Sequence, residues 1–153
     1  MRQPETRNFG QTEGKNVATN AQYVFDIAMG LMDELDEGSG KTDTADTKEY
    51  KQRTLLILNA LRGELFSLSG SCKSAPAGKR PVCPLITDFE KAVELDDFIC
   101  QSVMPYGLAA HLLVEENPAA ASFFQQRYNE LLRRYGDGVL SVSEDITDLY
   151  GGI

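Results

Sequence analysis

The stretch of sequence that decides the fold runs over residues 104–132 and reads MPYGLAAHLLVEENPAAASFFQQRYNELL. Its apolar residues recur every three or four positions on both sides of Asn117-Pro118, and this period is typical of amphipathic helices. Asparagine is a good N-cap and proline suits the first helical position, so the pair predicts the start of a new helix. We therefore expect two helices joined by a short connection. The second should end near Tyr135, because Gly136 follows it.

The first helix of this pair is expected over residues 95–114, and Pro105 lies inside it. Because proline has no N–H and its ring clashes with the preceding turn, we expect a kink or a break near Ser102. The predicted apolar faces consist of Leu95, Ile99, Val103, Tyr106, Ala110 and Leu113 in the first helix, and of Ala121, Phe124, Tyr128, Leu131, Leu132 and Tyr135 in the second.

Two more helices are predicted nearer the N-terminus. The first begins at Thr19 or Asn20, which are both good N-caps, and its apolar face runs from Val24 to Leu35. It ends in the acidic run 33–37, which opposes the helix dipole.

The other helix spans residues 47–65 and buries a stripe that begins at Tyr50 and ends at Leu65. Leu55 and Leu56 widen this stripe. We therefore expect this helix to be covered on more than one side.

Polar segments surround and separate these helices. Residues 1–18 and 136–153 have the composition of polar arms, and residues 67–88 form a long irregular stretch that holds half of the six prolines. The short alternation at 140–143 has no partner strand long enough for a sheet. The sequence thus predicts an all-α fold: one helical domain at 19–135 with about four helices in a small bundle, a long proline-rich loop and polar N- and C-terminal arms.

Charge and composition argue against several classes of protein. The chain has 153 residues and a net charge of −8, and so acidic a chain is a poor general nucleic-acid binder, because phosphate contacts need a basic face. No apolar run reaches the length of a membrane span, and residues 1–6 lack the apolar stretch of a secretory signal. We therefore expect the three cysteines to be reduced thiols, as in a cytoplasm, rather than to form a disulfide between Cys72 and Cys83.

Two groups of residues suggest a chemical role. Residues 38–42 read Gly-Ser-Gly-Lys-Thr, like the end of a phosphate-binding loop, but the glycine five positions before Gly40 and a preceding strand are missing. His111 is the only histidine, and with Glu115 on the next turn it offers fewer than the about three protein ligands of a catalytic metal site. We predict no catalytic, cofactor-binding or metal-ligating residue, with an enzyme that uses His111 or Lys41 as the remote alternative.

Basic and aromatic side chains are the candidate interface residues. The proline-rich loop and the last helix are locally basic within an acidic chain, which indicates contacts between copies or with another protein, with scattered solubilising charge as the alternative. Phe123 and Phe124 point about 100° apart on a helix, so we expect one of them on the surface. The candidates are Lys73, Lys79, Arg80, Phe123, Arg127, Arg133, Arg134, Leu149 and Tyr150.

Two segments of the chain resemble a known group of proteins. They are residues 50–65, YKQRTLLILNALRGEL, and residues 104–132, quoted above. Over residues 19–135 the chain resembles small helical proteins that are encoded in the head–tail module of tailed phages and prophages of Gram-positive bacteria. Some members of this group are head–tail connector (adaptor) proteins.

This resemblance implies a structural, non-enzymatic subunit without cofactors. It implies a ring of identical copies at the portal that extends the DNA channel, with portal and tail or neck proteins as partners. DNA would pass through the channel without sequence-specific binding, repelled by an acidic wall. The implied location is the virion neck, and the host cytoplasm during assembly, with no membrane contact. A tail-completion protein or an assembly chaperone of the same module is the alternative.

Overall fold

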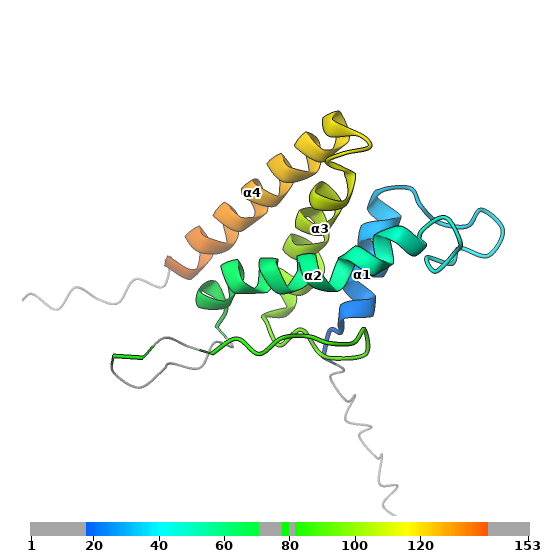
Figure 1. The fold of residues 1–153 in the computed structure, drawn as a ribbon. Coiled ribbons are helices and arrows are strands. Elements are labelled where there is room, and N and C mark those ends of the chain that lie inside the picture. The colour runs from blue at the N-terminus through cyan, green and yellow to red at the C-terminus, as the bar shows by residue number, and fades with distance from the viewer. Residues whose placement is uncertain (1–17, 71–77, 80–81, 141–153) are drawn as a thin grey trace, which may run out of the picture.

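The structure, a computed structural model, describes residues 18–70, 78–79 and 82–140. Within these residues the regular secondary structure is helical (Figure 1), and one isolated bridge joins Asn20 to Ala92. The helices are α1 (Ala21–Leu31), α2 (Lys48–Leu65), the 3-10 turn η1 (Phe66–Leu68), the π-helical turn η2 (Ile99–Val103), α3 (Met104–Leu113) and α4 (Pro118–Leu140). The prediction of an all-α fold is confirmed.

Helix α3 lies at the centre of the bundle and packs against α1, α2 and α4. It contains no acidic residue, lysine or arginine, and only Tyr106 and His111 are not buried. A helix that is apolar on nearly all sides is stable only where neighbours cover it. The segment that decides the fold in the sequence is therefore the one around which the other helices pack (Figure 1).

A glycine lets three helices meet closely on α3. A Cβ atom added to Gly107 would lie 2.9 Å from Cδ2 and Cε2 of Tyr128 in α4, and 3.2 Å from Cδ1 of Leu61 in α2. Real Cβ atoms do not approach neighbours that closely. The absence of a side chain at Gly107 is thus what allows the Tyr128 ring to lie against α3.

The buried side of α2 carries an arginine. Arg62 is 2% exposed. Its Nε donates to the carbonyl oxygen of Val93 at 2.9 Å, and its Nη1 donates to the carbonyl oxygen of Pro84. Because a buried cation without hydrogen bonds is costly, Arg62 stays inside only while both carbonyls remain in place.

One turn earlier in α2, Asn59 binds the backbone of Ile86 in both directions. Its Nδ2 donates to the carbonyl oxygen of Ile86 at 2.9 Å, and its Oδ1 accepts from the N–H of Ile86 at 2.8 Å. Together with Arg62, Asn59 holds the irregular segment 82–95 against α2, below which it runs in Figure 1. This described part of the connection belongs to the scaffold of the fold.

The exposed side of α2 differs from the prediction. Tyr50, Leu58 and Leu65 are buried as expected, but Leu56 is 77% exposed. The prediction that α2 is covered at Leu56 was therefore wrong. The residue that extends the buried side of α2 is Arg62 instead.

Helix α1 is closed at both ends by local hydrogen bonds. Asn20 is the N-cap, as predicted, and its side chain accepts from the N–H of Tyr23 at 2.9 Å. At the other end, Asp33 has a left-handed backbone with φ of 61°, and the N–H of Glu34 donates to the carbonyl oxygen of Met29 at 2.9 Å. This C-terminal motif ends α1 at Leu31, before the acidic run 33–37, so these carboxylates are part of a turn and not of the helix.

The buried face of α1 is displaced from the predicted one. Phe25 and Met29 are fully buried, whereas Leu35, which was expected on this face, lies beyond the end of the helix and is exposed. Val24 and Ala28 are buried as predicted.

The disturbance predicted near Pro105 is the π-helical turn η2. The N–H of Met104 donates to the carbonyl oxygen of Ile99, five residues back, and Pro105 takes the second position of α3. Proline has no N–H to donate, and the second position of a helix does not require one. The wider π-helical turn before it therefore lets the chain continue as a helix without a break.

Helix α4 is longer than predicted. It continues to Leu140, whereas the sequence predicted its end, and the start of an arm, at Gly136. The ring of Tyr135 stacks on Phe98 with centroids 5.7 Å apart, and its hydroxyl donates to the carboxylate of Asp96. These contacts fix the helix just before Gly136 and outweigh the about 1 kcal/mol that a glycine costs inside a helix. The helical domain therefore extends to Leu140.

Replacement of Gly107 tests this packing. We expect Gly107→Ala to lower the free energy of unfolding by about 1–3 kcal/mol, because the new methyl group overlaps the Tyr128 ring. The matched control is Gly63→Ala in α2, where no atom lies within 4 Å of the added Cβ; here helix propensity should raise the free energy of unfolding by up to about 1 kcal/mol. Urea unfolding measures both, and a Gly107→Ala variant as stable as Gly63→Ala would contradict the close approach.

Candidate interaction surfaces

Three of the candidate interface residues lie on one side of α4. Phe123, Arg127 and Arg134 follow one another at intervals of four and seven residues, so they project within about 40° of one another. Glu130 lies between them. We call these four residues the α4 stripe. Arg133, the other candidate of this helix, is exposed but projects about 100° away from Arg134.

The α4 stripe combines an exposed ring with an oriented cation. Phe123 is 61% exposed, whereas Phe124 is buried beside Tyr106, which confirms that one of the two rings lies on the surface. Nη1 of Arg127 donates to a carboxylate oxygen of Glu130 at 3.1 Å, and the guanidinium lies 6.0 Å from the centre of the Tyr106 ring. The Glu130 carboxylate, more than any other group, raises the pKa of Arg127. The charge of Arg127 is thus permanent and held in one direction.

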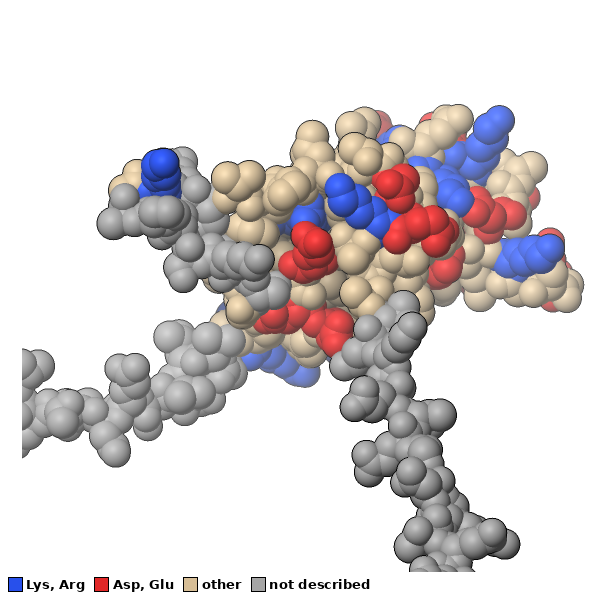
Figure 2. Space-filling view, turned by 90° about the horizontal axis from the view of Figure 1, so that it is seen from below, with Lys and Arg blue, Asp and Glu red and all other residues tan. Residues whose placement is uncertain are grey.

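The remaining candidates are not brought to this stripe. Lys79 is exposed, in the short described piece of the proline-rich loop. Lys73, Arg80, Leu149 and Tyr150 lie outside the described residues and stay predictions. Figure 2 presents the face seen from below, on which acidic and basic side chains are interspersed rather than gathered by sign.

The connection between α1 and α2, together with the first two residues of α2, forms an acidic loop, residues 33–49, with seven acidic residues and two lysines. The Asp36 carboxylate orders it: one oxygen accepts from the N–H groups of Gly38 at 3.2 Å and Ser39 at 2.7 Å, and from the Ser39 hydroxyl at 2.7 Å. The Ser39 hydroxyl, followed by the two N–H groups, holds the pKa of Asp36 below its ordinary value. The loop therefore keeps a defined shape and its negative charge.

The same hydrogen bonds argue against phosphate binding at residues 38–42. The N–H groups that would cradle a phosphate already bind the carboxylate of Asp36. The Thr42 hydroxyl, which would face a metal ion in a phosphate-binding loop, donates to a carboxylate oxygen of Asp26 at 2.6 Å. A loop built around its own carboxylates repels phosphate, so this segment acts as a helix–helix connection.

The sole histidine lies on the surface at the end of α3. His111 is exposed, and its carbonyl oxygen, like that of Leu112, accepts from the guanidinium of Arg53 at 3.3–3.4 Å. These bonds satisfy carbonyls at the helix C-terminus, where a cation is also favoured by the dipole. Among the described residues, no group of three or more histidine, cysteine or carboxylate side chains is arranged to hold a metal ion. In the same part of the chain, no helix is both long and apolar enough to cross a bilayer.

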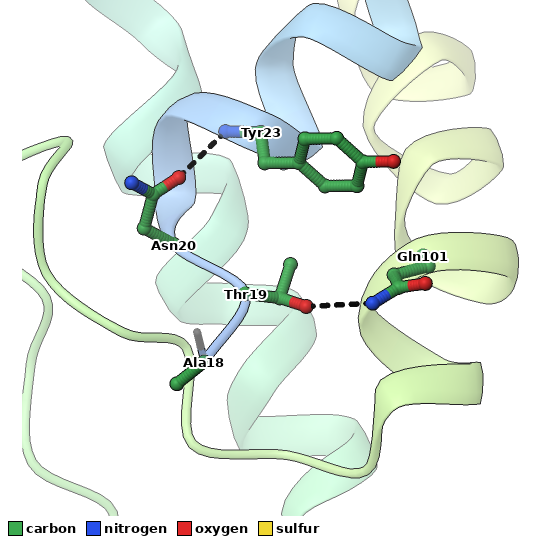
Figure 3. Close-up of a pocket in the computed structure, with 5 residues that line it drawn as sticks. All are labelled: Ala18, Thr19, Asn20, Tyr23 and Gln101. Atoms are coloured by element: carbon green, nitrogen blue, oxygen red, sulfur yellow. Dashed lines mark hydrogen bonds between the residues drawn. The ribbon is translucent and has the colours of Figure 1, made fainter. Parts of the chain in front are cut away.

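An open hollow of about 310 Å³ lies where the described chain begins (Figure 3). Its polar groups already serve the fold. Nε2 of Gln101 donates to the hydroxyl of Thr19 at 3.0 Å, and the side chain of Asn20 caps α1. The lining residues are Ala18, Thr19, Asn20, Tyr23 and Gln101.

A second hollow, of about 400 Å³, lies between α1, α2 and the start of α4. The hydroxyl of Tyr50 donates to the carboxylate of Glu116 there. Burial, and then the Glu116 carboxylate, raise the pKa of Tyr50, so this hydroxyl keeps its proton at neutral pH. The pair ties α2 to the connection before α4 and is a structural contact.

Comparison with known proteins identifies no relative. No protein-family model matches the chain, and neither a curated protein nor a solved structure matches it.

One cysteine of the described residues is sealed in the core. The thiol of Cys100 donates to the carbonyl oxygen of Leu95 at 3.4 Å, and burial raises its pKa to about 11. Cys83 is half-buried, and neither of these two is in a disulfide. Because the fold favours the neutral thiol, the stability it gains there is fully present below the ordinary pKa of 9.0 and is lost as the pH rises through about 11.

Alkylation tests this burial. At pH 8 the folded chain should react with iodoacetamide much more slowly at Cys100 than at the less buried Cys83, because the rise in the pKa of Cys100 from 9.0 to about 11 leaves about 100-fold less thiolate there and burial slows access further. The comparison is internal to one sample, and peptide mass spectrometry reads both sites. In denaturant the two rates should converge. Equal rates in the folded chain would contradict the burial of Cys100.

Proposed function

We propose that this chain is a structural, non-enzymatic subunit of a phage or prophage head–tail connector (adaptor), which assembles as a ring at the portal and extends the DNA channel. Two lines of argument support the proposal. The first is the resemblance of residues 50–65 and 104–132 to small helical proteins of the head–tail module. The second is the distribution of charge in the fold.

The opposite local charges of two surfaces of the molecule are the observation that carries the proposal. The acidic loop has a net charge of −5, and the α4 segment 123–134 has a net charge of +2. In Figure 1 the acidic loop (cyan) extends at the right-hand end of the molecule, and α4 runs from the top (yellow) to the left-hand end (orange). The two surfaces therefore lie on different elements of one subunit and differ in the sign of their charge.

A subunit with two complementary surfaces favours head-to-tail contacts. Such contacts are heterologous, and they generate a closed ring when the rotation between neighbours closes. A charge distribution of this kind also fixes the register in which copies meet. Both properties suit a ring of identical subunits around a channel.

The overall charge suits the passage of DNA. At −8 the chain repels phosphate, so DNA would slide through such a ring without being held. The partners in this proposal are further copies of the chain, the portal and the tail or neck proteins. The location is the neck of the virion, and the host cytoplasm before assembly.

Quantitative mass spectrometry of density-purified particles from the induced source strain tests this function. We expect roughly a dozen copies per particle, in a fixed ratio to the portal protein, as for a ring of cyclic symmetry. The crude lysate of the same culture serves as the control for expression. Absence from intact particles, with the protein abundant in the lysate, would overturn the connector proposal and favour an assembly chaperone.

A further inference from the structure

The α4 stripe has the features of a protein contact rather than of a solvated helix face. Phe123 presents an apolar ring with most of its surface in water, next to two cations one and three turns along the same side of α4. Aromatic residues and arginine are enriched at the centres of protein interfaces. Glu130 bonds Arg127 and so reduces the side-chain freedom that binding would otherwise remove.

The acidic loop is a suitable partner because it is ordered before any contact forms. Besides the turn around Asp36, the hydroxyl of Thr47 donates to the carbonyl oxygen of Thr42 at 2.5 Å, and Lys51 pairs with Asp43. The exposed acidic residues include Glu37 and Asp46. A loop held by its own hydrogen bonds loses little conformational entropy on binding.

We propose that the α4 stripe of one copy binds the acidic loop of the next copy, so that the contact repeats head to tail. This inference rests on the proposed function and names the surface by which the ring would form. Phe123 is the apolar anchor of the contact. Arg127 and Arg134 pair with carboxylates of the neighbouring loop.

Two observations favour a second copy over nucleic acid as the occupant of this stripe. A carboxylate, Glu130, lies in the middle of the α4 stripe, and it would face the phosphates of a bound strand. The surface that matches the stripe in charge, the acidic loop, is present in the chain itself. In a closed ring of copies, each acidic loop and each stripe also forms one such contact.

Charge reversal on the two surfaces tests the contact. Sedimentation equilibrium of the full chain is run at low salt up to about 1 mM, where a contact worth about −4 kcal/mol is half populated. We expect the wild-type chain to associate. Arg127→Glu with Arg134→Glu, and separately Glu37→Lys with Asp46→Lys, should each lower the association constant by about tenfold or more. An equimolar mixture of the two variants should associate again, since the unchanged stripe of one variant then meets the unchanged acidic loop of the other.

The chain supplies a matched control for the stripe. Arg133→Glu makes the same charge change as Arg134→Glu alone, at the next position but off the stripe, and it should leave the association constant within about threefold of wild type, since Arg133 projects about 100° away from Arg134. Circular dichroism confirms that each variant is folded. A photo-reactive p-benzoylphenylalanine in place of Phe123 should crosslink to residues 33–49 of another copy, identified with a mixture of isotopically labelled and unlabelled chains.

Several outcomes would overturn the inference. These are a wild-type chain that neither associates nor crosslinks at about 1 mM, a Phe123 crosslink only to other segments, or variants that fail to complement each other. Binding of a short DNA duplex that is lost in the stripe variant would make nucleic acid the occupant instead. If particles contain the ring but the reversals have no effect, the connector function stands and this contact is wrong. If the contact forms but particles lack the protein, the contact stands and the connector function is wrong.

Discussion

The buried guanidinium of Arg62 is the constraint on which the rest of the fold depends. It occupies a core position of α2, and two backbone carbonyls from one irregular segment accept its hydrogen bonds. Water is excluded from this site, so the loss of either bond leaves a buried charged group without a partner. An irregular segment without strands of its own is thereby attached to α2.

The position of this segment decides where the first and third helices lie. The N–H of Ala21 donates to the carbonyl oxygen of Lys91 at 3.1 Å, and that of Val93 to the carbonyl oxygen of Thr19 at 2.9 Å, so the start of α1 is attached to the segment that Arg62 holds. The same segment leads into η2 and α3, against which α4 packs. The positions of the acidic loop after α1 and of the stripe on α4 follow from these attachments. The proposed assembly thus depends on a contact in the interior of each subunit.

Local rules were sufficient for most of the helices. Asn20 and Asn117 mark helix starts because a cap requires only its own turn, and the side of α4 that carries Phe124 follows from the helical period alone. Arg62 could not be predicted in the same way, because patterning assigns arginine to the surface and its acceptors lie 22 and 31 residues away. The end of α4 could not be predicted locally either, since the contacts of Tyr135 outweigh the tendency of Gly136 to end the helix.

The candidate surface was predictable only in part. The sequence identified the basic residues of the last helix. It did not show that Arg127 and Arg134 share a stripe from which Arg133 is separate, because this depends on which side of α4 faces α3. The acidic run 33–37 was expected at the end of the first helix, but it lies in the acidic loop. Its order arises from the way in which Asp36 binds the backbone after it, which no composition or period indicates.

Amide hydrogen exchange at two positions tests most directly whether Arg62 holds the segment 82–95. The N–H of Ile86 binds the side chain of Asn59 at 2.8 Å, and the N–H of Val93 binds the carbonyl oxygen of Thr19 at 2.9 Å. In the wild-type chain both should be as protected as the amide of Tyr128 in α4. In Arg62→Leu both should exchange about tenfold or more faster relative to Tyr128, which corresponds to about 1.4 kcal/mol of local opening. If this ratio is unchanged by the substitution, or if both amides exchange rapidly in the wild-type chain, Arg62 is not the constraint that organises the fold.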